Sequence, residues 1–352
     1  MDAHALDTFF ASVPKAEIHV HLIGAVPLPT LIALAKRHGV PLPYKDDPAE
    51  LYERGENFDR VLKTLKLIAT VMRDADDFRR VAYDVQADAA RCGVVYREIF
   101  WNPTDHITAQ NIPYEVAQDA LIAGLRDAER DHGIIGRLIP SIDREGSPEL
   151  GLQMVEATIA HPRDETIGIG MDYLEIDHPP EKFWRAYRRA GEAGLRRTAH
   201  AGEMLQPARN VATALDLLGC ERIDHGYTII DDPALLQRAK DAGIIFTVVP
   251  SNSTYSRVLK GQDFLTVHPL AEMVRQGLRL SPASDDPPLH HTDPAHCYTA
   301  MVTTFGATLD DCRAYWEATI DAAFVDDGTR RAWRAEWLSA FDAARAKLAA
   351  AA

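Results

Sequence analysis

The chain has 352 residues, of which 46% are hydrophobic and 26% charged, and a formal net charge of −14. This balance is typical of a globular protein with a large core, and the negative charge argues against a general nucleic-acid or anionic-membrane partner. No apolar run reaches the roughly 20 residues of a membrane-spanning helix, and the acidic start differs from a signal peptide. Because the four cysteines are scattered and form no CxxC pair, we expect reduced, buried thiols in a cytoplasmic protein of undetermined oligomeric state.

Short apolar runs, most of them rich in Ile and Val, alternate with amphipathic stretches along the chain. Eight of these runs are predicted strands, at 17–23, 94–102, 134–142, 166–175, 195–201, 222–226, 244–252 and 278–286. Such alternation predicts an α/β protein folded as a parallel (β/α)8 TIM barrel, with residues 1–352 forming a single domain. A doubly wound open sheet is the rival fold, but no GxGxxG follows the first run to hold a dinucleotide.

Two stretches exceed what a simple barrel needs. The interval between the first two predicted strands contains several helical patterns, so we interpret residues 28–92 as a helical insertion that forms part of a lid. The chain after Asp293 is also helical in pattern, and Trp333 and Trp337 recur there at near-helical spacing, which is typical of core packing. We therefore expect extra C-terminal helices.

The stretch EIHVHLIGA, at residues 17–25, places His19 and His21 two residues apart in an apolar run. Residues i and i+2 of a strand point to the same face, which puts the two imidazoles about 6–7 Å apart along the strand. That separation suits one divalent ion held between them. Two histidines satisfied by neighbours within the core are the alternative for so short a motif.

Ionisable residues also end several other predicted strands, where the side chains of a barrel converge on one mouth. They are Asp172, Glu175, His200, Glu203, Asp224, His225, Asp285 and Asp286. Zinc suits a ligand set of three imidazoles and one carboxylate, with one position left for water. Here the set would be His19, His21, His200 and Asp285.

Four blocks, PKAEIHVHLIGA, TAHAGE, RIDHGY and ASDDPP, resemble in order and spacing the signature blocks of the adenosine deaminase family within the amidohydrolase superfamily. The resemblance implies a barrel with one zinc ion per subunit, bound by His19, His21, His200 and Asp285. It also implies a small-molecule purine substrate. The implied reaction is the zinc-dependent hydrolytic deamination of a 6-aminopurine, such as adenosine, adenine or a derivative, to the 6-oxo purine plus ammonia.

The same resemblance implies roles for three further side chains. Glu203 is the implied proton donor, His225 the implied base or water-orienting group, and Asp286 the implied contact to the purine. These roles agree with the chemistry, because a ring nitrogen must receive a proton as a nucleophile derived from water adds to the ring. The alternatives are a helix N-terminal acid for Glu203, a structural neighbour of the ligands for His225, and a cap of the helix near Pro287 for Asp286.

The remaining polar residues near the mouth divide into two groups. The expected substrate-binding residues are His21, Ile23, Asp172, Glu175 and Asp286. Asp224 is expected to be structural, and His290 and His291 are expected to be solvated loop residues.

Two positions depart from the pattern of the family's nucleoside-using members. Ile23 stands where those members have an acid that is implied to hold a ribose hydroxyl, and a buried hydroxyl left unpaired costs about 1–3 kcal/mol. Glu175 stands where they have a glycine. The run MDYLEIDHPPEKF is closer to the branch that deaminates free adenine, although that branch has a glutamate at the position of Ile23. We therefore expect a pocket that is apolar near Ile23.

Two other readings remain at this point. A related amidohydrolase acting on another amino-heterocycle, such as a modified purine or a pterin, would use the same residues at the strand ends. A non-catalytic binding protein built on the same barrel would be expected to lack a ligand or the acid, and this chain retains all of them.

Overall fold

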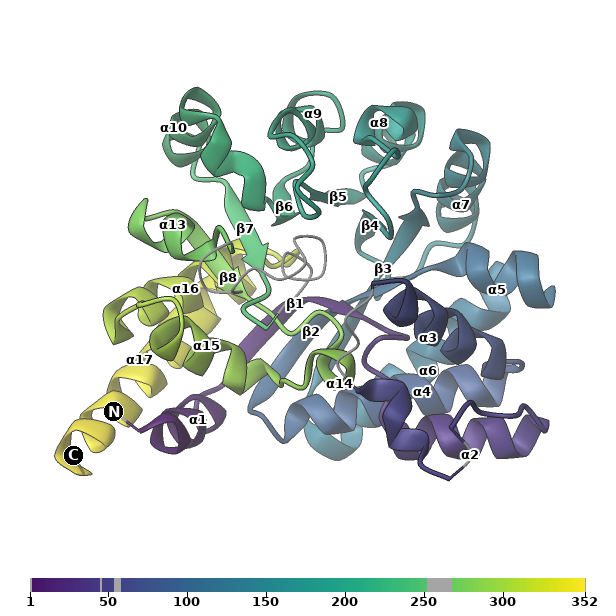
Figure 1. The fold of residues 1–352 in the computed structure, drawn as a ribbon, viewed down its shortest axis with the longest axis horizontal. Helices are drawn as coiled ribbons and strands as arrows, with labels where there is room; N and C mark the ends of the chain where they lie inside the picture. The colour runs from purple at the N-terminus through teal and green to yellow at the C-terminus, as the bar shows by residue number, and fades with distance from the viewer. Residues whose placement is uncertain (1, 45, 54–57, 252–267, 352) are drawn as a thin grey trace.

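Strands and helices alternate along the chain in the computed structural model, which describes residues 2–44, 46–53, 58–251 and 268–351 (Figure 1). The eight strands are β1 (Lys15–His21), β2 (Val94–Trp101), β3 (Ile135–Asp143), β4 (Gly168–Asp172), β5 (Arg196–Ala201), β6 (Arg222–His225), β7 (Ile245–Val248) and β8 (Arg279–Pro282). Each strand pairs in parallel with the next one along the chain. A bridge between Val20 and Asp285 returns the end of the last strand to the first. The sheet is therefore a nearly closed barrel, and the predicted TIM-barrel fold is confirmed.

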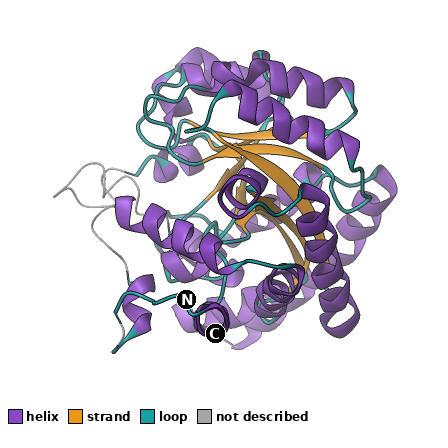
Figure 2. Cartoon of the chain, turned by 90° about the vertical axis from the view of Figure 1, so that its right-hand side faces the viewer, coloured by secondary structure: helices purple, strands orange, loops and turns teal. Residues whose placement is uncertain are grey.

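Helices surround this sheet, which lies at the centre of the molecule in the side view (Figure 2). They are α1 (Ala3–Ala11), α2 (Leu28–His38), α3 (Phe58–Val71), α4 (Ala75–Ala90), α5 (Pro103–Gln110), α6 (Tyr114–His132), α7 (Pro148–Ala160), α8 (Trp184–Glu192), α9 (Arg209–Asp216), α10 (Pro233–Asp241), α13 (Leu270–Arg275), α14 (Pro287–His290), α15 (Pro294–Thr303), α16 (Leu309–Ala322) and α17 (Asp327–Ala351), with short 3-10 helices η1 (Pro48–Tyr52), η2 (Pro180–Phe183) and η3 (Tyr227–Asp231). None of the helices in these ranges combines the length and apolar character needed to cross a membrane.

The helices beyond the basic barrel lie where the sequence indicated. Between β1 and β2 the chain forms α2, η1, α3 and α4, which confirms the helical insertion after the first strand. After β8 it forms α14 to α17, which confirms the extra C-terminal helices. The ring of Phe341 in α17 contacts that of Phe9 in α1 at a centroid distance of 5.2 Å. The last helix therefore packs against the first, and both lie near the chain ends in Figure 1.

Three of the predicted strands extend three or more residues too far at their carboxyl ends. The run predicted at 166–175 ends as a strand at Asp172, and the run at 278–286 ends at Pro282. The run at 244–252 ends at Val248, and its last residue lies outside the described ranges. Tyr173 and Asp285 have positive φ angles of 69° and 62°, which do not continue a strand ladder. Glu175, Asp285 and Asp286 therefore lie in the segments that follow the strands.

The amino-terminal end of the barrel is closed by a buried ionic cluster. Arg222, the first residue of β6, pairs with Glu98 of β2 at 2.5 Å and also donates to the backbone oxygens of Ile18 and Ala322. Tyr96 donates its hydroxyl to the same Glu98 carboxylate at 2.9 Å. Each of these polar side chains is less than 2% exposed, so the cluster forms part of the packed core. We call the set Tyr96, Glu98 and Arg222 the foot cluster.

The four cysteines are free thiols, as predicted. Cys220, Cys297 and Cys312 are buried and Cys92 is half-buried. Burial raises the pKa of Cys220 and Cys297 well above the ordinary thiol value, which keeps both in the unreactive protonated form. These residues are core packing.

Candidate active site

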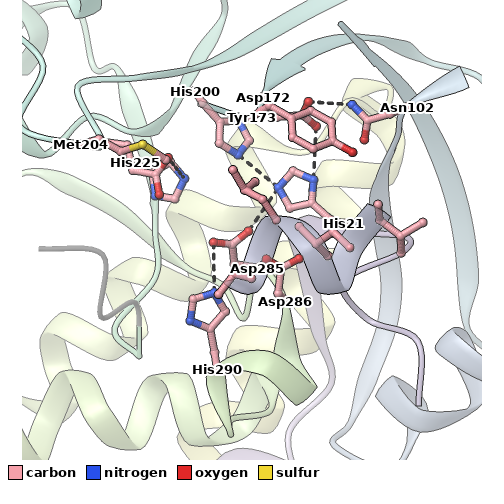
Figure 3. A pocket seen from close by; sticks show the side chains of 15 residues that line it. His21, Asn102, Asp172, Tyr173, His200, Met204, His225, Asp285, Asp286 and His290 are labelled. Carbon is pink, nitrogen blue, oxygen red and sulfur yellow. Dashed lines mark hydrogen bonds and ion pairs between the residues drawn. The ribbon is translucent and has the colours of Figure 1, made fainter. Parts of the chain in front are cut away.

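A cavity opens at the carboxyl ends of the strands and is lined by both polar and apolar side chains. Its polar residues are His21, Asn102, Asp172, Tyr173, His200, Glu203, His225, Asp285, Asp286 and His290. Its apolar residues are Ile23, Val61, Leu62, Leu65 and Met204. Figure 3 shows the labelled polar side chains converging from several strand ends. This is the mouth at which a barrel of parallel strands places its chemistry.

Four side chains from three separate parts of the chain meet at the base of this cavity. His19, His21, His200 and Asp285 each offer one ligand atom, and these atoms all lie within 4.8 Å of one another. Nε2 of His21 is 3.2 Å from Nε2 of His200 and 3.1 Å from Oδ1 of Asp285, and Nε2 of His19 is 3.5 Å from the same oxygen. The structure thus brings together the whole predicted ligand set, which we call the ligand cluster.

The hydrogen bonds of His19 determine which of its nitrogens faces the cluster. Thr247 donates its hydroxyl to Oδ1 of Asp224 at 2.8 Å, so its oxygen accepts from Nδ1 of His19 at 2.7 Å. Nε2 of His19 faces Oδ1 of Asp285 at 3.5 Å and is buried without a hydrogen-bond partner among the described residues. A metal ion between this nitrogen and the carboxylate would satisfy both buried groups, so the cluster fits a metal ion.

His21 is oriented in the same way by a different partner. Oδ2 of Asp172 lies 3.2 Å from Nδ1 of His21, and Asn102 holds the other oxygen of Asp172 by a 2.6 Å hydrogen bond. Nε2 of His21 is thereby directed toward Asp285, as Figure 3 shows. Carboxylate or hydroxyl partners behind a histidine are typical of metal sites, because they fix the ring and its tautomer. Asp172, expected as a substrate contact, lines the cavity and supports His21.

Burial and neighbouring charges shift the pKa values of the histidines of the site in different directions. Burial lowers the pKa of His200 and His225 well below the ordinary value, and repulsion from His19 lowers both further. Burial also acts to lower the pKa of His21, but Asp172 and Asp285 together raise it well above the ordinary value. Burial acts to raise the pKa of Asp285, but His19 and His21 hold it well below its usual range. His200 and His225 are therefore neutral, whereas the raised pKa of His21 reflects two carboxylates whose charge a bound cation would balance instead.

Glu203 and His225 form a second pair on the wall of the cavity. Oε2 of Glu203 is 3.6 Å from Nε2 of His225, and the two residues are 5% and 0% exposed. The ring of His225 stacks edgewise against those of His19 and His200, at centroid distances of 4.8 and 4.7 Å. His225 has a φ of 66°, a conformation that costs a non-glycine residue about 1–2 kcal/mol and is concentrated at functional sites. Glu203 precedes α9 by six residues, so it does not serve as the N-terminal acid of that helix.

Asp286 and His290 lie on the other side of Asp285. Asp286 takes the N-cap position of α14 but its side chain makes no capping hydrogen bond, which removes the capping alternative. Nε2 of His290 is 3.6 Å from Asp285 and 3.8 Å from Asp286, and His290 is 5% exposed. The expectation that His290 is a solvated loop residue is therefore wrong: one turn of α14 carries it back into the cavity. His291 is exposed, and its ring nitrogen bonds the carbonyl of Tyr52.

Gly24 is required where the first block passes Asp286. A Cβ atom on Gly24 would lie 1.5 Å from Oδ1 of Asp286, which is closer than any non-bonded contact. The glycine in HLIGA therefore makes room for the Asp286 carboxyl group. Sequence reasoning did not assign this role, because the contact joins residues far apart in the chain.

Two expected substrate contacts differ in their placement. Ile23 is 5% exposed and lines the apolar side of the cavity beside Val61, Leu62 and Leu65 of α3. Glu175 is outside the cavity lining. Its carboxylate instead accepts hydrogen bonds from the backbone and from Asn210 of α9. Asp224, expected to be structural, is fully buried and accepts from Thr198 and Thr247 beneath the ligand cluster.

Sequence reasoning missed four residues that complete the site. They are Asn102, Arg144, Thr247 and His290. A weak signal existed for Asn102, which directly follows β2, and for His290, which is four residues after Asp286 and so returns to the same helix face. The sequence contains no such signal for Thr247 or Arg144, because their partners come from other parts of the barrel. The barrel and its ligand cluster place the chain among the amidohydrolases, a class of metal-binding barrel hydrolases.

Comparisons with known proteins agree with this class. The model of the adenosine deaminase family matches residues 14–338, and the chain belongs to that family. Adenine deaminases from Ralstonia pickettii and Streptomyces coelicolor are each 35% identical to it, over 94% and 95% of this chain and 96% of their own lengths. The chain is accordingly a hydrolase acting on C–N bonds in cyclic amidines.

Solved structures give the same picture. An amidohydrolase from Burkholderia ambifaria, determined with bound zinc, is 46% identical and superposes with a TM-score of 0.94, covering 99% of this chain and 96% of that structure. An adenine deaminase from Arthrobacter aurescens is 31% identical with a TM-score of 0.84, covering 93% and 98%. These likenesses extend over nearly the whole chain.

Proposed function

We propose that this protein is a zinc-dependent deaminase that converts a 6-aminopurine and water into the 6-oxo purine and ammonia. The observation that carries the proposal is the meeting of His19, His21, His200 and Asp285 beside the Glu203–His225 pair in one cavity. Relatives named adenine deaminase at 35% identity support the purine as substrate. A zinc-bound neighbour at 46% identity supports the metal.

The ligand cluster would hold one zinc ion, which supplies Lewis-acid chemistry that generates a nucleophile from water near neutral pH. The chain's own groups then move protons. His225 accepts a proton from the attacking water, and Glu203 donates one to the ring nitrogen next to the carbon that bears the amine. As the C–N bond breaks, His225 gives its proton to the departing amine, which leaves as ammonia, and Glu203 recovers a proton from the new hydroxyl group. The 3.6 Å separation of these two side chains keeps both within reach of the same reacting atoms. Asp286 hydrogen-bonds a second ring nitrogen and fixes the face of the purine.

The apolar side of the cavity supports free adenine as the preferred substrate. Ile23 and the α3 residues Val61, Leu62 and Leu65 lie where a group attached to the purine would extend, and none of them offers a hydrogen bond to a sugar. A ribose hydroxyl buried there without a partner would cost about 1–3 kcal/mol, or roughly 5–150-fold in specificity. The same apolar wall would favour a purine with an apolar substituent over adenosine. In this proposal α3 is the part of the insertion at 28–92 that acts as the lid.

A metal analysis combined with an ammonia-release screen tests the proposal. We expect about one zinc per chain, activity that a chelator removes and zinc restores, and a higher kcat/KM for adenine than for adenosine. Ile23→Asp supplies the missing acceptor without creating the glutamate of the adenine branch and should shift the ratio toward adenosine, whereas Ile23→Leu, which keeps the wall apolar, should not. Protein that releases ammonia from no purine while fully loaded with metal would contradict the proposed reaction, and would leave another amino-heterocycle as the substrate class.

A further inference from the structure

Glu175 is buried behind the wall of the active site, where it accepts hydrogen bonds from three donors. The backbone N–H groups of Gly202 and Glu203 donate to its two carboxylate oxygens, each at 2.9 Å. Nδ2 of Asn210 donates to Oε1 at 2.8 Å. Glu175 is 1% exposed, so these bonds are shielded from water. Two successive backbone N–H groups that converge on one anion form a strong anion-binding concavity, and here the anion belongs to the protein itself.

Arg144 extends this arrangement to the ligand cluster. Its Nη2 is 3.9 Å from Glu175, its Nη1 donates to the backbone oxygen of His200 at 2.8 Å, and its Nε donates to that of His178 at 2.9 Å. The side chain of Arg144 is completely buried. The pair Arg144–Glu175 therefore holds both a carbonyl and two N–H groups of the short segment 200–203, which carries one member of the ligand cluster and the implied proton donor.

The opposite side of the same segment is also fixed. The N–H groups of Gly226 and Thr228 donate to the backbone oxygens of Ala201 and Gly202, at 3.0 and 3.2 Å. Gly202 has a φ of 71°, and a Cβ atom there would lie 2.5 Å from Oγ1 of Thr228. The backbone between His200 and Glu203 thus turns sharply within a tight space. Among the described residues, Glu175 is the acceptor for the N–H groups of Gly202 and Glu203.

From these contacts we infer that Glu175, supported by Arg144, is a positioning residue that holds the backbone of Glu203 so that its carboxyl group reaches the reacting ring. The inference rests on the proposed function for the role of Glu203, but the hydrogen bonds that carry it are independent of the substrate. It replaces the expected direct contact of Glu175 with the purine. Because misplacement of a reacting group by about 1 Å can cost about 100-fold in rate, the effect should appear in turnover.

Glu175→Gln in the full-length protein is the decisive variant, because it keeps the shape but removes the charge and one acceptor. We expect kcat for adenine to fall about 10–100-fold, with KM changed by less than about threefold and zinc content per chain unchanged. Glu192→Gln, which removes an exposed carboxylate of α8, is the matched control and should retain full activity. An unchanged kcat with a raised KM would instead assign Glu175 to substrate binding and overturn the inference.

Two further measurements test the inference even if Glu175→Gln does not fold or if no purine is turned over. Asn210→Ala removes only one of the three donors, so it should lower kcat about two- to fivefold and remain soluble if Glu175→Gln does not fold. Hydrogen exchange of the amides of Gly202 and Glu203 should be faster in Glu175→Gln than in the wild type and in Glu192→Gln. This readout needs no substrate, so it tests the positioning even if no purine is turned over. Unchanged exchange of both amides, or activity that falls only in proportion to lost metal, would overturn the inference.

Discussion

The strand β6 has a buried polar residue at each end, and the two residues differ in whether their polar atoms are hydrogen-bonded. At the amino-terminal end Arg222 pairs with Glu98 at 2.5 Å and also bonds two backbone oxygens. At the carboxyl end neither ring nitrogen of His225 has a hydrogen-bond partner among the described residues, and its nearest charged neighbour, Glu203, is 3.6 Å away. These residues are three positions, or about 10 Å, apart.

This difference separates stability from function within one barrel. Buried polar groups are normally hydrogen-bonded, so a fully paired set such as the foot cluster belongs to the packed core. Buried groups that face a cavity without partners are kept available for a ligand, a metal or a reacting molecule. The conservative variants that follow should therefore change stability at the foot and chemistry at the mouth.

The largest expected effect is at the mouth. Glu203→Gln removes the proposed proton donor but preserves its size, so kcat should fall about 10²–10⁴-fold. Melting temperature and zinc content should stay near the wild-type values, because the carboxyl group faces the cavity. Steady-state kinetics and metal analysis on the same preparation measure both quantities. Full activity of this variant would exclude Glu203 as the donor.

The opposite pattern is expected at the foot. Glu98→Gln leaves Arg222 buried without its anion, and removing one partner of a buried pair costs about 3–5 kcal/mol of unfolding free energy. Denaturant unfolding should show this loss, while kcat of the folded protein stays within about twofold of the wild type. If Glu98→Gln instead lowered kcat as strongly as Glu203→Gln without loss of stability, the division between foot and mouth would be wrong.

An intermediate effect is expected beneath the ligand cluster. Thr247→Val keeps the side-chain shape but removes the hydroxyl that accepts from His19 and donates to Asp224. Loss of such a supporting group typically weakens metal binding about 10–100-fold, which competition with a chelator would measure. Thr303→Val in α15 is the matched control and should bind zinc normally. Equal zinc affinity of both variants would show that Thr247 does not orient His19.

The smallest expected effect concerns a carboxyl group beside the mouth. Burial raises the pKa of Asp105 to about 7, although the hydroxyl of Tyr173 donates to it at 2.5 Å. Because the folded state favours the protonated form, this group stabilises the fold most below pH about 4, and that stability is lost as pH rises through 7.

Asp105→Asn removes this titration while keeping an acceptor for Tyr173. The variant should match the wild type at pH 4 and melt a few degrees higher at pH 8. Thermal melts across this pH range measure the difference, with the exposed Asp119→Asn as control. A wild type that gains stability relative to Asp105→Asn between pH 4 and 8 would contradict the shifted pKa.

Much of the fold and the ligand cluster could be predicted without coordinates, because both depend on local regularities. Apolar runs that alternate with amphipathic stretches predict a parallel barrel, since strands covered on both faces must be apolar throughout. A two-residue spacing places His19 and His21 on one face, and barrel geometry requires strand ends to converge. The positions of His200, Glu203 and Asp285 at such ends follow from the same rule.

The tertiary structure alone decided what stands behind and around these residues. Glu175 supports Glu203 rather than lining the cavity, and His290 is buried rather than solvated. Thr247 and Arg144 gained their roles from neighbours on other strands. Sequence periodicity reports which face of an element is apolar, but it carries no information on which distant polar atoms will meet. Those contacts depend on strand register and loop conformation, and both are fixed only in the folded barrel.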